Sequence, residues 1–519
     1  MESKCDEAGE QNPINSEALV EWRPLLFVVL IISGCSICYE LIISAISTYL
    51  LGNSVLQYSV TIGLYMASMG LGAYLSKFVV HHLFRRLAQI ELLVGLLGGT
   101  SALLLFVSFL YLRSFRIVMY AEVIAIGVLV GAEIPILTRI VEADKRRLHV
   151  TLSSIFSVDY LGGLLGSIAF PLLLLPQLGF FATSFLCGFI NVVAASIILW
   201  RYGRRVAGVK SLRAVAACLL VGMAAGVVLS GSISDAIEGG LYRDTVIFSE
   251  QTPYQRIVLT KRSDDLRLFL DGNIQFCSKD EYRYHEALVQ IPIAMASSHE
   301  NVLILGGGDG LAAREILKHD DVKSITIVDI DPEITRLCSE HEAIAELNGG
   351  SLTDERVQVR NEDAKQFLTE SHDAYNVIII DLPDPNNEAL NQLYTGAFYR
   401  LVAAHLADGG TFVTQSTSPY YAREAFWCIH DTIEKEGLCV VPYHLQVPSF
   451  GDWGFNVASR GELKRDVRVQ VETKYLTDKN IGAMFEFGKD EARPDGIVAN
   501  TMDRPVLIEY YDKALTSWG

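Results

Sequence analysis

The sequence predicts a chain of two unlike halves: a multi-pass α-helical membrane domain of about seven helices, followed by a doubly wound α/β domain that begins with a small antiparallel β-sheet. Two observations lead to this prediction. Hydrophobic residues make up 50% of the 519 residues and concentrate before residue 232, whereas most of the charge lies after it. Beyond residue 299, short apolar strands alternate with helical patterns, which is typical of a parallel sheet with helices on both faces.

The domain bounds follow from these changes in composition. We expect a polar acidic tail over 1–23, the membrane domain over 24–232, the small sheet with one helix over 240–298, and the α/β domain with a C-terminal extension over 299–519. Because the first apolar segment follows an acidic tail, a cleavable signal peptide is not expected.

Seven stretches in the first half are long enough to cross a bilayer, since a spanning helix needs roughly 20 apolar residues. They cover about 24–46, 55–76, 87–110, 115–137, 155–177, 179–200 and 212–232. Only residues 176–179 separate the fifth stretch from the sixth, and we expect a tight helical hairpin there. The sequence therefore predicts a multi-pass protein of the cell membrane.

Basic residues lie in alternate loops, which predicts that these loops are cytoplasmic. They are Lys77, Arg85, Arg86, Arg139, Lys145, Arg146, Arg147, Arg201, Arg204, Arg205, Lys210 and Arg213, with Arg113 and Arg116 as exceptions in a loop on the other side. Seven crossings from a cytoplasmic N-terminus would place the α/β domain outside. The nine cysteines suggest no disulfide framework, which favours the reducing side instead.

Five acids fall inside the apolar stretches, where a carboxylate is costly and usually faces a cavity or a partner. They are Glu40, Glu91, Glu122, Glu133 and Asp159. One interpretation is a cation-attracting pathway between helices, suited to amines. The other is local pairing, for instance with Arg139.

In the second half, strand patterns cover 245–248, 255–260 and 266–270, and Asp271-Gly272 predicts a hairpin. A helix is expected over 281–295 and another over 311–318. Buried strands are expected over 302–305, 324–328, 357–359, 377–380 and 411–414. The cysteines of this half show no metal-binding spacing, so we predict no metal site.

Chemistry-bearing residues follow three of these strands. Gly306-Gly-Gly-Asp309-Gly ends the first, Asp329 ends the second, and Asp381-Leu-Pro-Asp384 ends the fourth. A glycine loop followed by an acid about twenty residues later is a nucleoside-binding arrangement. Asp309 would repel a pyrophosphate or a ligand carboxylate and would attract a tail that ends in an ammonium. Two further carboxylates at the same sheet edge also favour an amine ligand.

Seven motifs, in order, resemble those of the polyamine aminopropyltransferases, the spermidine synthase family, and of its membrane-embedded multi-pass branch. They are Thr252-Pro-Tyr-Gln255-Arg, Leu270-Asp-Gly-Asn-Ile-Gln275, Tyr284-His285-Glu286, Gly306-Gly-Gly-Asp309-Gly, Val328-Asp329-Ile-Asp331-Pro, Glu362-Asp363-Ala364 and Asp381-Leu-Pro-Asp384-Pro. The resemblance covers about residues 250–455. It implies a Rossmann-like, methyltransferase-type catalytic domain.

The resemblance also implies residue roles. Decarboxylated S-adenosylmethionine, as co-substrate, would be held by Gln255, Gln275, Gly306, Gly307, Gly308, Asp309, Asp329, Asp363 and Ala364. Asp329 would bind the ribose, Asp363 the adenine amino group, and Asp309 the aminopropyl amine. Tyr284, His285, Asp309 and Asp384 would bind the substrates' amines, and Asp381 would be the general base. Asp331 is expected to cap the helix that begins at Pro332. No metal or prosthetic group is expected.

The implied reaction transfers the aminopropyl group to an amine, foremost putrescine, giving spermidine and methylthioadenosine. Three alternatives stay open: another acceptor (spermidine, a longer diamine or a membrane-associated amine), a polyamine transporter or sensor, and a methyltransferase, which Asp309 disfavours. The family's acceptor-contacting Tyr-Pro-Ser-Gly segment reads Val447-Pro-Ser-Phe-Gly-Asp-Trp453 here, which leaves the acceptor open.

The expected partners are a small polyamine and the lipid bilayer, with no nucleic acid. A homo-oligomer, foremost a dimer, is expected because soluble relatives assemble in this way. Since the nucleoside co-substrate is made in the cytosol, we place the catalytic domain on the cytoplasmic side, against the loop charges.

Overall fold

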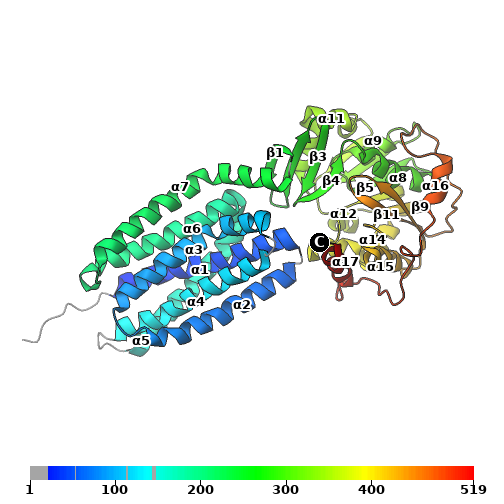
Figure 1. Ribbon diagram of the computed structural model, residues 1–519. Helices are drawn as coiled ribbons and strands as arrows, with labels where there is room; N and C mark the ends of the chain where they lie inside the picture. Colours follow the sequence, from blue (N-terminus) through cyan, green and yellow to red (C-terminus); the bar gives the residue numbers. More distant parts are fainter. Residues whose placement is uncertain (1–21, 53, 113–114, 143–147, 243, 519) are drawn as a thin grey trace, which may run out of the picture. The chain divides into compact units, whose positions relative to one another are not determined.

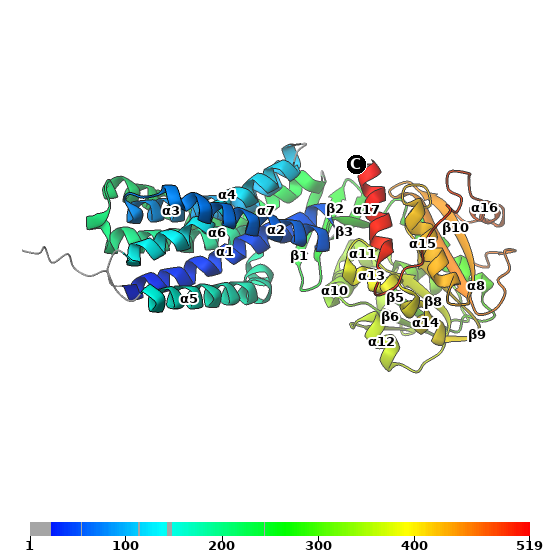
Figure 2. The ribbon, with the colours of Figure 1, turned by 90° about the horizontal axis from the view of Figure 1, so that it is seen from below.

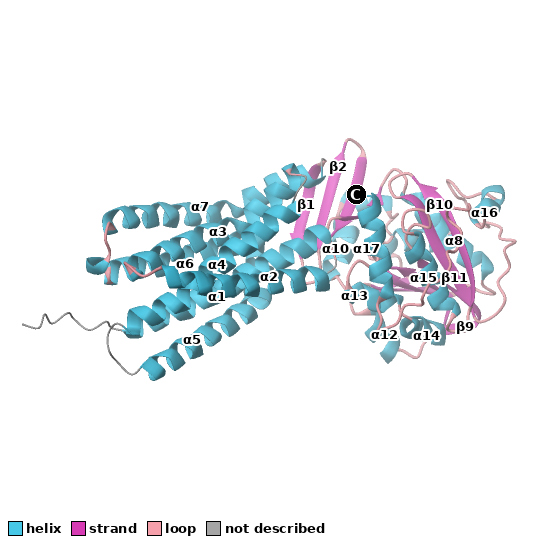
Figure 3. Ribbon diagram, turned by 60° about the horizontal axis from the view of Figure 1, so that its bottom comes forward, coloured by secondary structure: helices cyan, strands magenta, loops and turns pink. Residues whose placement is uncertain are grey.

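The computed structural model describes residues 22–52, 54–112, 115–142, 148–242 and 244–518. Nearly all of the predicted tail over 1–23 lies outside the described residues, as do Arg113, Lys145, Arg146 and Arg147. The chain divides into two compact units: residues 1–43, 61–108 and 113–230 form the first, and residues 44–60, 109–112 and 231–519 form the second. Figure 3 shows that the strands belong to the second unit.

Long helices that run side by side make up the first unit (Figures 1 and 2). They are α1 (Trp22–Leu51), α2 (Ser54–Leu75), α3 (Leu83–Tyr111), α4 (Phe115–Glu142), α5 (Leu148–Ala169), α6 (Leu175–Arg201) and α7 (Val209–Tyr242). The parts of α1, α2, α3 and α7 within 44–60, 109–112 and 231–242 belong to the second unit. Within α6, Gly179 adopts a φ of 70° and a ψ of −178°, which breaks the helical path at the end of the predicted 176–179 turn.

Among the described residues, five stretches are long and apolar enough to cross a membrane by length and composition. They are Pro24–Leu51, Leu83–Tyr111, Phe115–Val141, Leu152–Arg201 and Val209–Tyr242. Leu152–Arg201 has 50 residues and contains most of α5 together with α6, whereas α2 is not among the five. The number of membrane crossings therefore stays a prediction.

The acids of the apolar stretches are largely buried within this unit. Glu91 is fully buried, and its Oε2 accepts a hydrogen bond from Asn191 Nδ2 at 2.9 Å. Arg139 instead donates to the main-chain oxygens of Ser76 and Val79, at 2.8 and 2.9 Å. The Arg139 guanidinium therefore binds main-chain oxygens near the end of α2. In the part of the chain that the structure describes, no ion pair between Arg139 and these acids is found.

The second unit begins with an antiparallel sheet of four strands in sequential order. These are β1 (Thr245–Gln251), β2 (Arg256–Arg262), β3 (Asp265–Leu270) and β4 (Asn273–Cys277), followed by α8 (Glu281–Met295). Asp271 and Gly272 both have positive φ, 48° and 80°, as a two-residue type I′ hairpin requires. The predicted hairpin and the helix over 281–295 are confirmed, and β4 is an additional strand.

A seven-stranded sheet follows, in the order β10-β11-β9-β8-β5-β6-β7. Its strands are β5 (Asn301–Gly306), β6 (Ser324–Val328), β7 (Val357–Arg360), β8 (Tyr375–Asp381), β9 (Leu406–Gln415), β10 (Cys439–Val447) and β11 (Gly451–Ser459). The five expected strands pair in parallel. The expected parallel arrangement of these five strands is confirmed, and β10 and β11 add an antiparallel edge that was not expected.

Helices cover both faces of this sheet, as alternation along β5 illustrates. Val302 and Ile304 pack into one buried cluster with residues of α8, α9 and α16, whereas Leu303 and Leu305 pack into another with α12, α14, α15 and α17. The helices are α9 (Leu311–Ile316), α10 (Pro332–Glu340), α11 (Glu342–Leu347), α12 (Ala364–Glu370), α13 (Glu388–Asn391), α14 (Gly396–Ala404), α15 (Arg423–Glu434), α16 (Asp478–Met484) and α17 (Val506–Trp518). Burial of each aliphatic side chain in these clusters contributes about 1.5–3 kcal/mol to the free energy of unfolding.

Helix α8 also anchors the C-terminal extension. The fully buried Glu286 carboxylate accepts hydrogen bonds from the backbone N–H groups of Lys474, Tyr475 and Leu476, at 2.6, 3.0 and 3.0 Å. We expect Glu286→Ala to destabilise the second unit by about 3 kcal/mol, because three backbone N–H donors lose their shared carboxylate acceptor. Thermal unfolding measures this loss. Glu286→Gln, which keeps one oxygen, should lose less, and an unchanged midpoint for the alanine variant would contradict the assignment.

Candidate active site

The site lies where parallel strands end. Gly306 at the end of β5 is in register with Asp381 at the end of β8, and Asp329 directly follows β6. Such carboxyl edges are where doubly wound sheets bind ligands. Three segments that are far apart in sequence therefore meet at one edge.

The glycine loop is shaped by two close backbone approaches. Gly306 has a φ of 82°, and a Cβ there would lie 2.0 Å from the main-chain oxygen of Asp381. A Cβ at Gly308 would lie 2.6 Å from Asp329 Oδ2, which accepts a hydrogen bond from the Gly308 N–H at 3.0 Å. Glycine at these positions therefore allows the loop to rest directly on both carboxylate-bearing strand ends.

Asp329 is held rigidly by backbone donors. Its Oδ1 accepts from the Asp331 N–H at 3.0 Å, in addition to the bond from Gly308. Burial raises the pKa of Asp329 to about 6, although these N–H groups oppose the rise. A carboxylate has about four acceptor positions, so two oxygens fixed in this way can still receive a pair of hydroxyl donors.

Asp331 has a structural role. Its side chain caps α10 by accepting from the Glu333 N–H at 3.1 Å, which confirms the predicted cap. The other oxygen of Asp331 accepts from Thr252 Oγ1 at 2.8 Å and from Gln255 Nε2 at 3.0 Å. This network fixes the Gln255 side chain at the wall of the site.

Asp309 sits at the start of α9, where its Oδ1 accepts from the Leu311 N–H at 2.9 Å. Burial raises the pKa of this carboxyl group, and the positive charge of His285 opposes the rise. Glu281, which is close enough to add its own negative charge, raises it further. Asp309 is thus a buried acid whose charged form gains from any cation that enters.

Asp381 is paired with a tyrosine from α8. The Tyr284 hydroxyl donates to Asp381 Oδ1 at 2.6 Å. Burial raises the pKa of Asp381 to about 6, and the charge of Asp309 adds to the rise, whereas His285 and the Tyr284 hydrogen bond oppose it. A buried carboxylate with a raised pKa is the kind of group that accepts protons near neutral pH.

Asp384 is fixed by residues from two distant elements. Gln415 at the end of β9 donates to Asp384 Oδ1 at 3.2 Å, and Tyr511 of α17 donates to Oδ2 at 2.8 Å. Burial raises the pKa of Asp384 to about 6 despite these donors. Asp384 therefore also has a pKa close to neutral pH.

His285 supplies positive charge to this acidic region. Its Nδ1 lies 2.9 Å from Glu281 Oε2, and Arg314 binds both oxygens of the same glutamate at 2.8 and 2.9 Å. Burial would lower the pKa of His285, but the hydrogen bond and charge of Glu281 outweigh it and raise the pKa to about 9. His285 is protonated at neutral pH and balances part of the charge of Asp309 and Asp381.

Every residue predicted for the site lines one cavity at this edge. These are Gln255, Gln275, Tyr284, His285, Gly306, Gly307, Gly308, Asp309, Asp329, Asp363, Ala364, Asp381 and Asp384. Asp363 also caps α12 by accepting from the Gln366 N–H at 2.8 Å, and Gln275 Nε2 donates to the Asn273 carbonyl at 3.2 Å. The roles of these residues stay predictions.

Comparison with known proteins places this site in a family. The spermine/spermidine synthase domain family matches residues 281–469. A polyamine aminopropyltransferase of Oceanobacillus iheyensis is 41% identical over 507 residues, which cover 96% of this chain and 99% of that protein. A polyamine aminopropyltransferase of Leptospira interrogans is 42% identical over 489 residues, covering 94% and 98%. The chain belongs to the polyamine aminopropyltransferase family.

Both halves of this aminopropyltransferase are shared with its relatives, because matches of this coverage cannot be confined to the catalytic unit. The solved spermidine synthase from Thermotoga maritima is 26% identical, covers 47% of this chain and 84% of its own, and has a TM-score of 0.43.

Several side chains of the aminopropyltransferase site were missed by sequence reasoning. Phe450 and Trp453 line the cavity beside Tyr284, with ring centroids of Tyr284 and Phe450 5.9 Å apart and of Phe450 and Trp453 5.1 Å apart. Trp453 Nε1 is buried without a hydrogen-bond partner among the described residues. Gln415 and Tyr511 were also missed. The departure at 447–453 was the available signal, because it places two aromatic residues where the family pattern differs.

Proposed function

We propose that this aminopropyltransferase transfers the aminopropyl group of decarboxylated S-adenosylmethionine to putrescine, with Asp381 as general base. The observation that carries the proposal is the placement of three carboxylates, the buried Asp309 and the half-buried Asp381 and Asp384, around one cavity beside a nucleoside-type glycine loop. The donor carries an ammonium and a sulfonium, and the acceptor carries two ammonium groups. Such ligands suit a buried acidic site.

The donor binds along the glycine loop. Asp329 accepts the ribose hydroxyls, and Asp363 with Ala364 borders the adenine. Gln255 and Gln275 border the thioether end, and Asp309 pairs with the ammonium of the aminopropyl chain. Support for this assignment comes from the position of all these residues on the same cavity wall. A carboxylate at Asp309 is unsuited to the α-carboxylate of S-adenosylmethionine, since two buried negative charges repel.

The acceptor binds between Tyr284, His285, Asp381 and Asp384. It arrives as an ammonium with a pKa of about 10, which cannot attack until it loses a proton. Asp381 takes that proton. Its raised pKa reduces the difference in pKa between the substrate ammonium and the Asp381 carboxylate, which makes the proton transfer less unfavourable. Asp384 holds the far ammonium, and the faces of Phe450 and Trp453 offer additional cation–π contacts.

The bond changes balance without a covalent enzyme intermediate. The amine nitrogen forms a bond to the propyl carbon beside the sulfonium, the carbon–sulfur bond breaks, and its electron pair neutralises the sulfur of the departing methylthioadenosine. Beyond removal of the proton, most of the rate acceleration comes from alignment of the two substrates by the fixed carboxylates. Because charge on sulfur disappears in the transition state, a buried site favours the reaction.

The assignment of the base predicts a pH dependence. Below a pH of about 6, Asp381 is protonated and cannot take the acceptor's proton, so kcat/KM should fall as the pH drops through that value. Tyr284→Phe removes a hydrogen bond that stabilises the carboxylate, so the pKa of Asp381 should rise and this decline should begin at higher pH. Initial rates between pH 5 and about 9 measure both effects.

The matched control for this pH profile is Tyr511→Phe, which removes the corresponding hydrogen bond from Asp384. It should leave the pH of the decline unchanged. A shift in Tyr511→Phe but not in Tyr284→Phe would assign the base to Asp384 instead.

The acceptor is tested with a panel of amines and product identification by mass spectrometry. Spermidine as the main product from putrescine supports the proposal. Preference for spermidine, a longer diamine or an amine presented at a bilayer surface would replace putrescine while leaving the donor chemistry intact. Methyl transfer from S-adenosylmethionine would overturn both the donor assignment and the acceptor assignment.

We further propose that the helical unit lies in the cell membrane and that the catalytic unit works on the cytoplasmic side as a homodimer. Support for the membrane comes from the five apolar stretches and from exposed side chains such as Leu164, Leu104 and Val228. Protease access to a C-terminal tag in intact cells tests the side, and mass measurement of the detergent-solubilised protein tests the dimer. Protection from protease supports the cytoplasmic placement.

A second candidate activity is the passage of an amine through the helical unit. The observation that favours it is the set of buried carboxylate oxygens without a hydrogen-bond partner among the described residues, namely Glu91 Oε1, Glu133 Oε1 and both oxygens of Glu122. Uptake of radiolabelled putrescine by vesicles containing the Asp381→Asn protein, which is expected to lack turnover, tests it. No uptake above empty vesicles would exclude it.

A further inference from the structure

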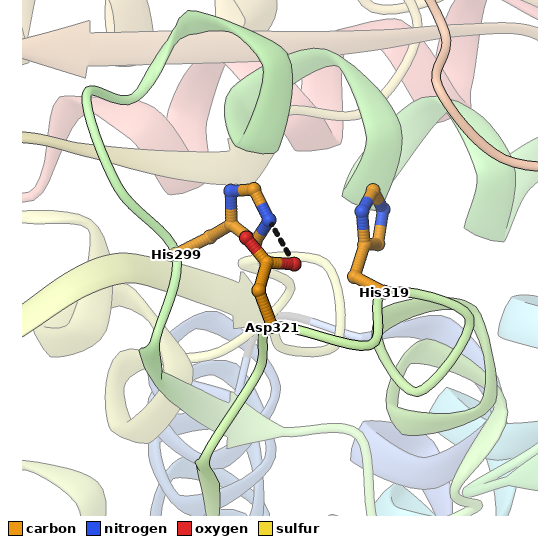
Figure 4. A group of neighbouring side chains, drawn as sticks. All are labelled: His299, His319 and Asp321. Carbon is orange, nitrogen blue, oxygen red and sulfur yellow. Dashed lines mark hydrogen bonds and ion pairs between the residues drawn. The ribbon is translucent and has the colours of Figure 1, made fainter.

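Two histidines and an aspartate gather at the sheet edge opposite the active site. His299 precedes β5, whereas His319 and Asp321 lie in the turn between α9 and β6. Because β5 and β6 are parallel neighbours, the residues that precede both strands come to the same amino edge of the sheet. Figure 4 shows the three side chains converging there, with a dashed line between His299 and Asp321. The glycine loop and Asp381 lie at the carboxyl edge instead.

The three side chains are close enough to share one ion. His299 Nε2 lies 2.8 Å from Asp321 Oδ1, and the ring centroids of His299 and His319 are 5.0 Å apart. One nitrogen or oxygen from each residue lies within 4.8 Å of the others. The His319 residue is 7% exposed, and the side chain of Asp321 is 66% exposed, so a buried ligand is combined with one that is free to adjust.

The hydrogen bonds around His319 fix which of its nitrogens carries the proton. Gln290 Nε2 donates to the Glu315 main-chain oxygen at 3.2 Å, so Gln290 Oε1 is the atom that faces His319 Nε2 at 2.9 Å. That oxygen only accepts, which makes His319 Nε2 the N–H and leaves the lone pair on Nδ1. In Figure 4 the His319 ring turns one nitrogen toward His299 and Asp321. A metal-ligating histidine is usually oriented by a hydrogen bond of this kind.

A cavity of about 260 Å³ lies beside these residues, and the exposed Arg468 borders it.

Two other clusters of similar composition lack an oriented imidazole lone pair beside an exposed carboxylate that no arginine binds. In the first, Asp431 is bound by His430 at 3.0 Å and by Arg493 at 2.8 Å, so a guanidinium already provides the positive charge. In the second, both nitrogens of His444 are engaged, Nδ1 by Asp452 at 2.8 Å and Nε2 by the Glu486 main-chain oxygen at 2.9 Å. Of the three clusters found within the described ranges, only the one with His319 combines an oriented imidazole lone pair with an exposed carboxylate that no arginine or lysine binds.

We propose that His299, His319 and Asp321 bind one divalent transition-metal ion, with Zn²⁺ as the best fit. Two imidazole nitrogens and one carboxylate oxygen, with water as the fourth ligand, match the tetrahedral preference of Zn²⁺. Binding replaces the His299–Asp321 hydrogen bond: the ring proton of His299 is held on Nδ1, the lone pair of Nε2 binds the metal, and the ligand atoms come to about 2.0–2.2 Å from the metal. The ion ties the start of β5 to the turn before β6, away from the reacting groups.

Metal binding is tested on the full-length protein in detergent, purified without a polyhistidine tag and stripped with a chelator. Equilibrium dialysis against micromolar Zn²⁺ should give one ion per chain. Co²⁺ should give the absorption bands of a tetrahedral nitrogen and oxygen site. His299→Ala and His319→Ala should each weaken Zn²⁺ binding at least tenfold and abolish the Co²⁺ bands, whereas the control His430→Ala should retain both.

Thermal unfolding provides a readout that separates binding from folding. Zn²⁺ should raise the unfolding midpoint of the wild type by several degrees, since a ligand that binds the folded state stabilises it. Asp321→Asn, at an exposed position, should match the wild type without metal and lose most of that rise. Equal Zn²⁺ binding by the wild type and all three site variants, or no binding by the wild type at micromolar Zn²⁺, would overturn the proposal.

Discussion

Replacing Asp381 by asparagine is expected to reduce kcat for aminopropyl transfer by about 10²–10⁴-fold while leaving donor affinity nearly unchanged. Asparagine has the same shape, and its oxygen can still accept the 2.6 Å hydrogen bond from Tyr284. It cannot take a proton from the acceptor ammonium. Product formation followed by mass spectrometry gives kcat, and calorimetry with the donor gives the affinity.

Asp384→Asn is the matched control, because the two carboxylates follow the same strand and both have a pKa of about 6. It should mainly raise the KM for the acceptor amine, since Asp384 is assigned to binding. Normal turnover by Asp381→Asn, or equal losses of kcat in both variants, would remove Asp381 from the role of base.

Asp309→Asn is expected to erase the preference for the decarboxylated donor. The amide oxygen can still accept from the Leu311 N–H, so the start of α9 should keep its geometry. The charge that pairs with the donor ammonium is lost, however, and a charged hydrogen bond is worth about 1.5–3 kcal/mol. Affinity for decarboxylated S-adenosylmethionine should fall about 10–100-fold, whereas affinity for S-adenosylmethionine should stay constant or improve.

The control for donor discrimination is Asp329→Asn, in the same cavity, at the residue that we propose to bind the ribose. Since both nucleosides carry the same ribose, this variant should weaken them equally. If Asp309→Asn also weakened the two donors by the same factor, Asp309 would not read the charge of the tail.

Local sequence patterns were sufficient to predict the sheet edge of the site. The apolar strands before Gly306, Asp329 and Asp381 are short, uninterrupted and separated by helical patterns, so their ends could be aligned without knowing the register. The Asp271-Gly272 hairpin was predictable because its positive φ values restrict the residues that fit. Roles within the site came from the family motifs, because carboxylates at a sheet edge do not by themselves distinguish a base from a binding group.

Long-range contacts account for what the sequence did not predict. Tyr511 reaches Asp384 across 127 positions of the chain, and Gln415 reaches it across 31. Neither residue lies in a motif, and a tyrosine in an amphipathic helix is usually interpreted as packing. The antiparallel strands β10 and β11 were not predicted. Buried residues such as Tyr443 and Leu445 alternate with more exposed ones in β10, so the segment lacks the uninterrupted apolar run that marks the parallel strands.

The hydrogen bond from Tyr511 to Asp384 bears on how the enzyme can be trimmed. The match to the spermine/spermidine synthase domain ends at residue 469, yet α17 and the backbone that Glu286 binds both lie beyond that point. A minimal catalytic fragment cut at this boundary would leave Asp384, which we propose to bind the acceptor, without the Tyr511 hydroxyl, and would leave the buried Glu286 without its backbone N–H donors. Recombinant fragments of this enzyme should therefore extend through α17.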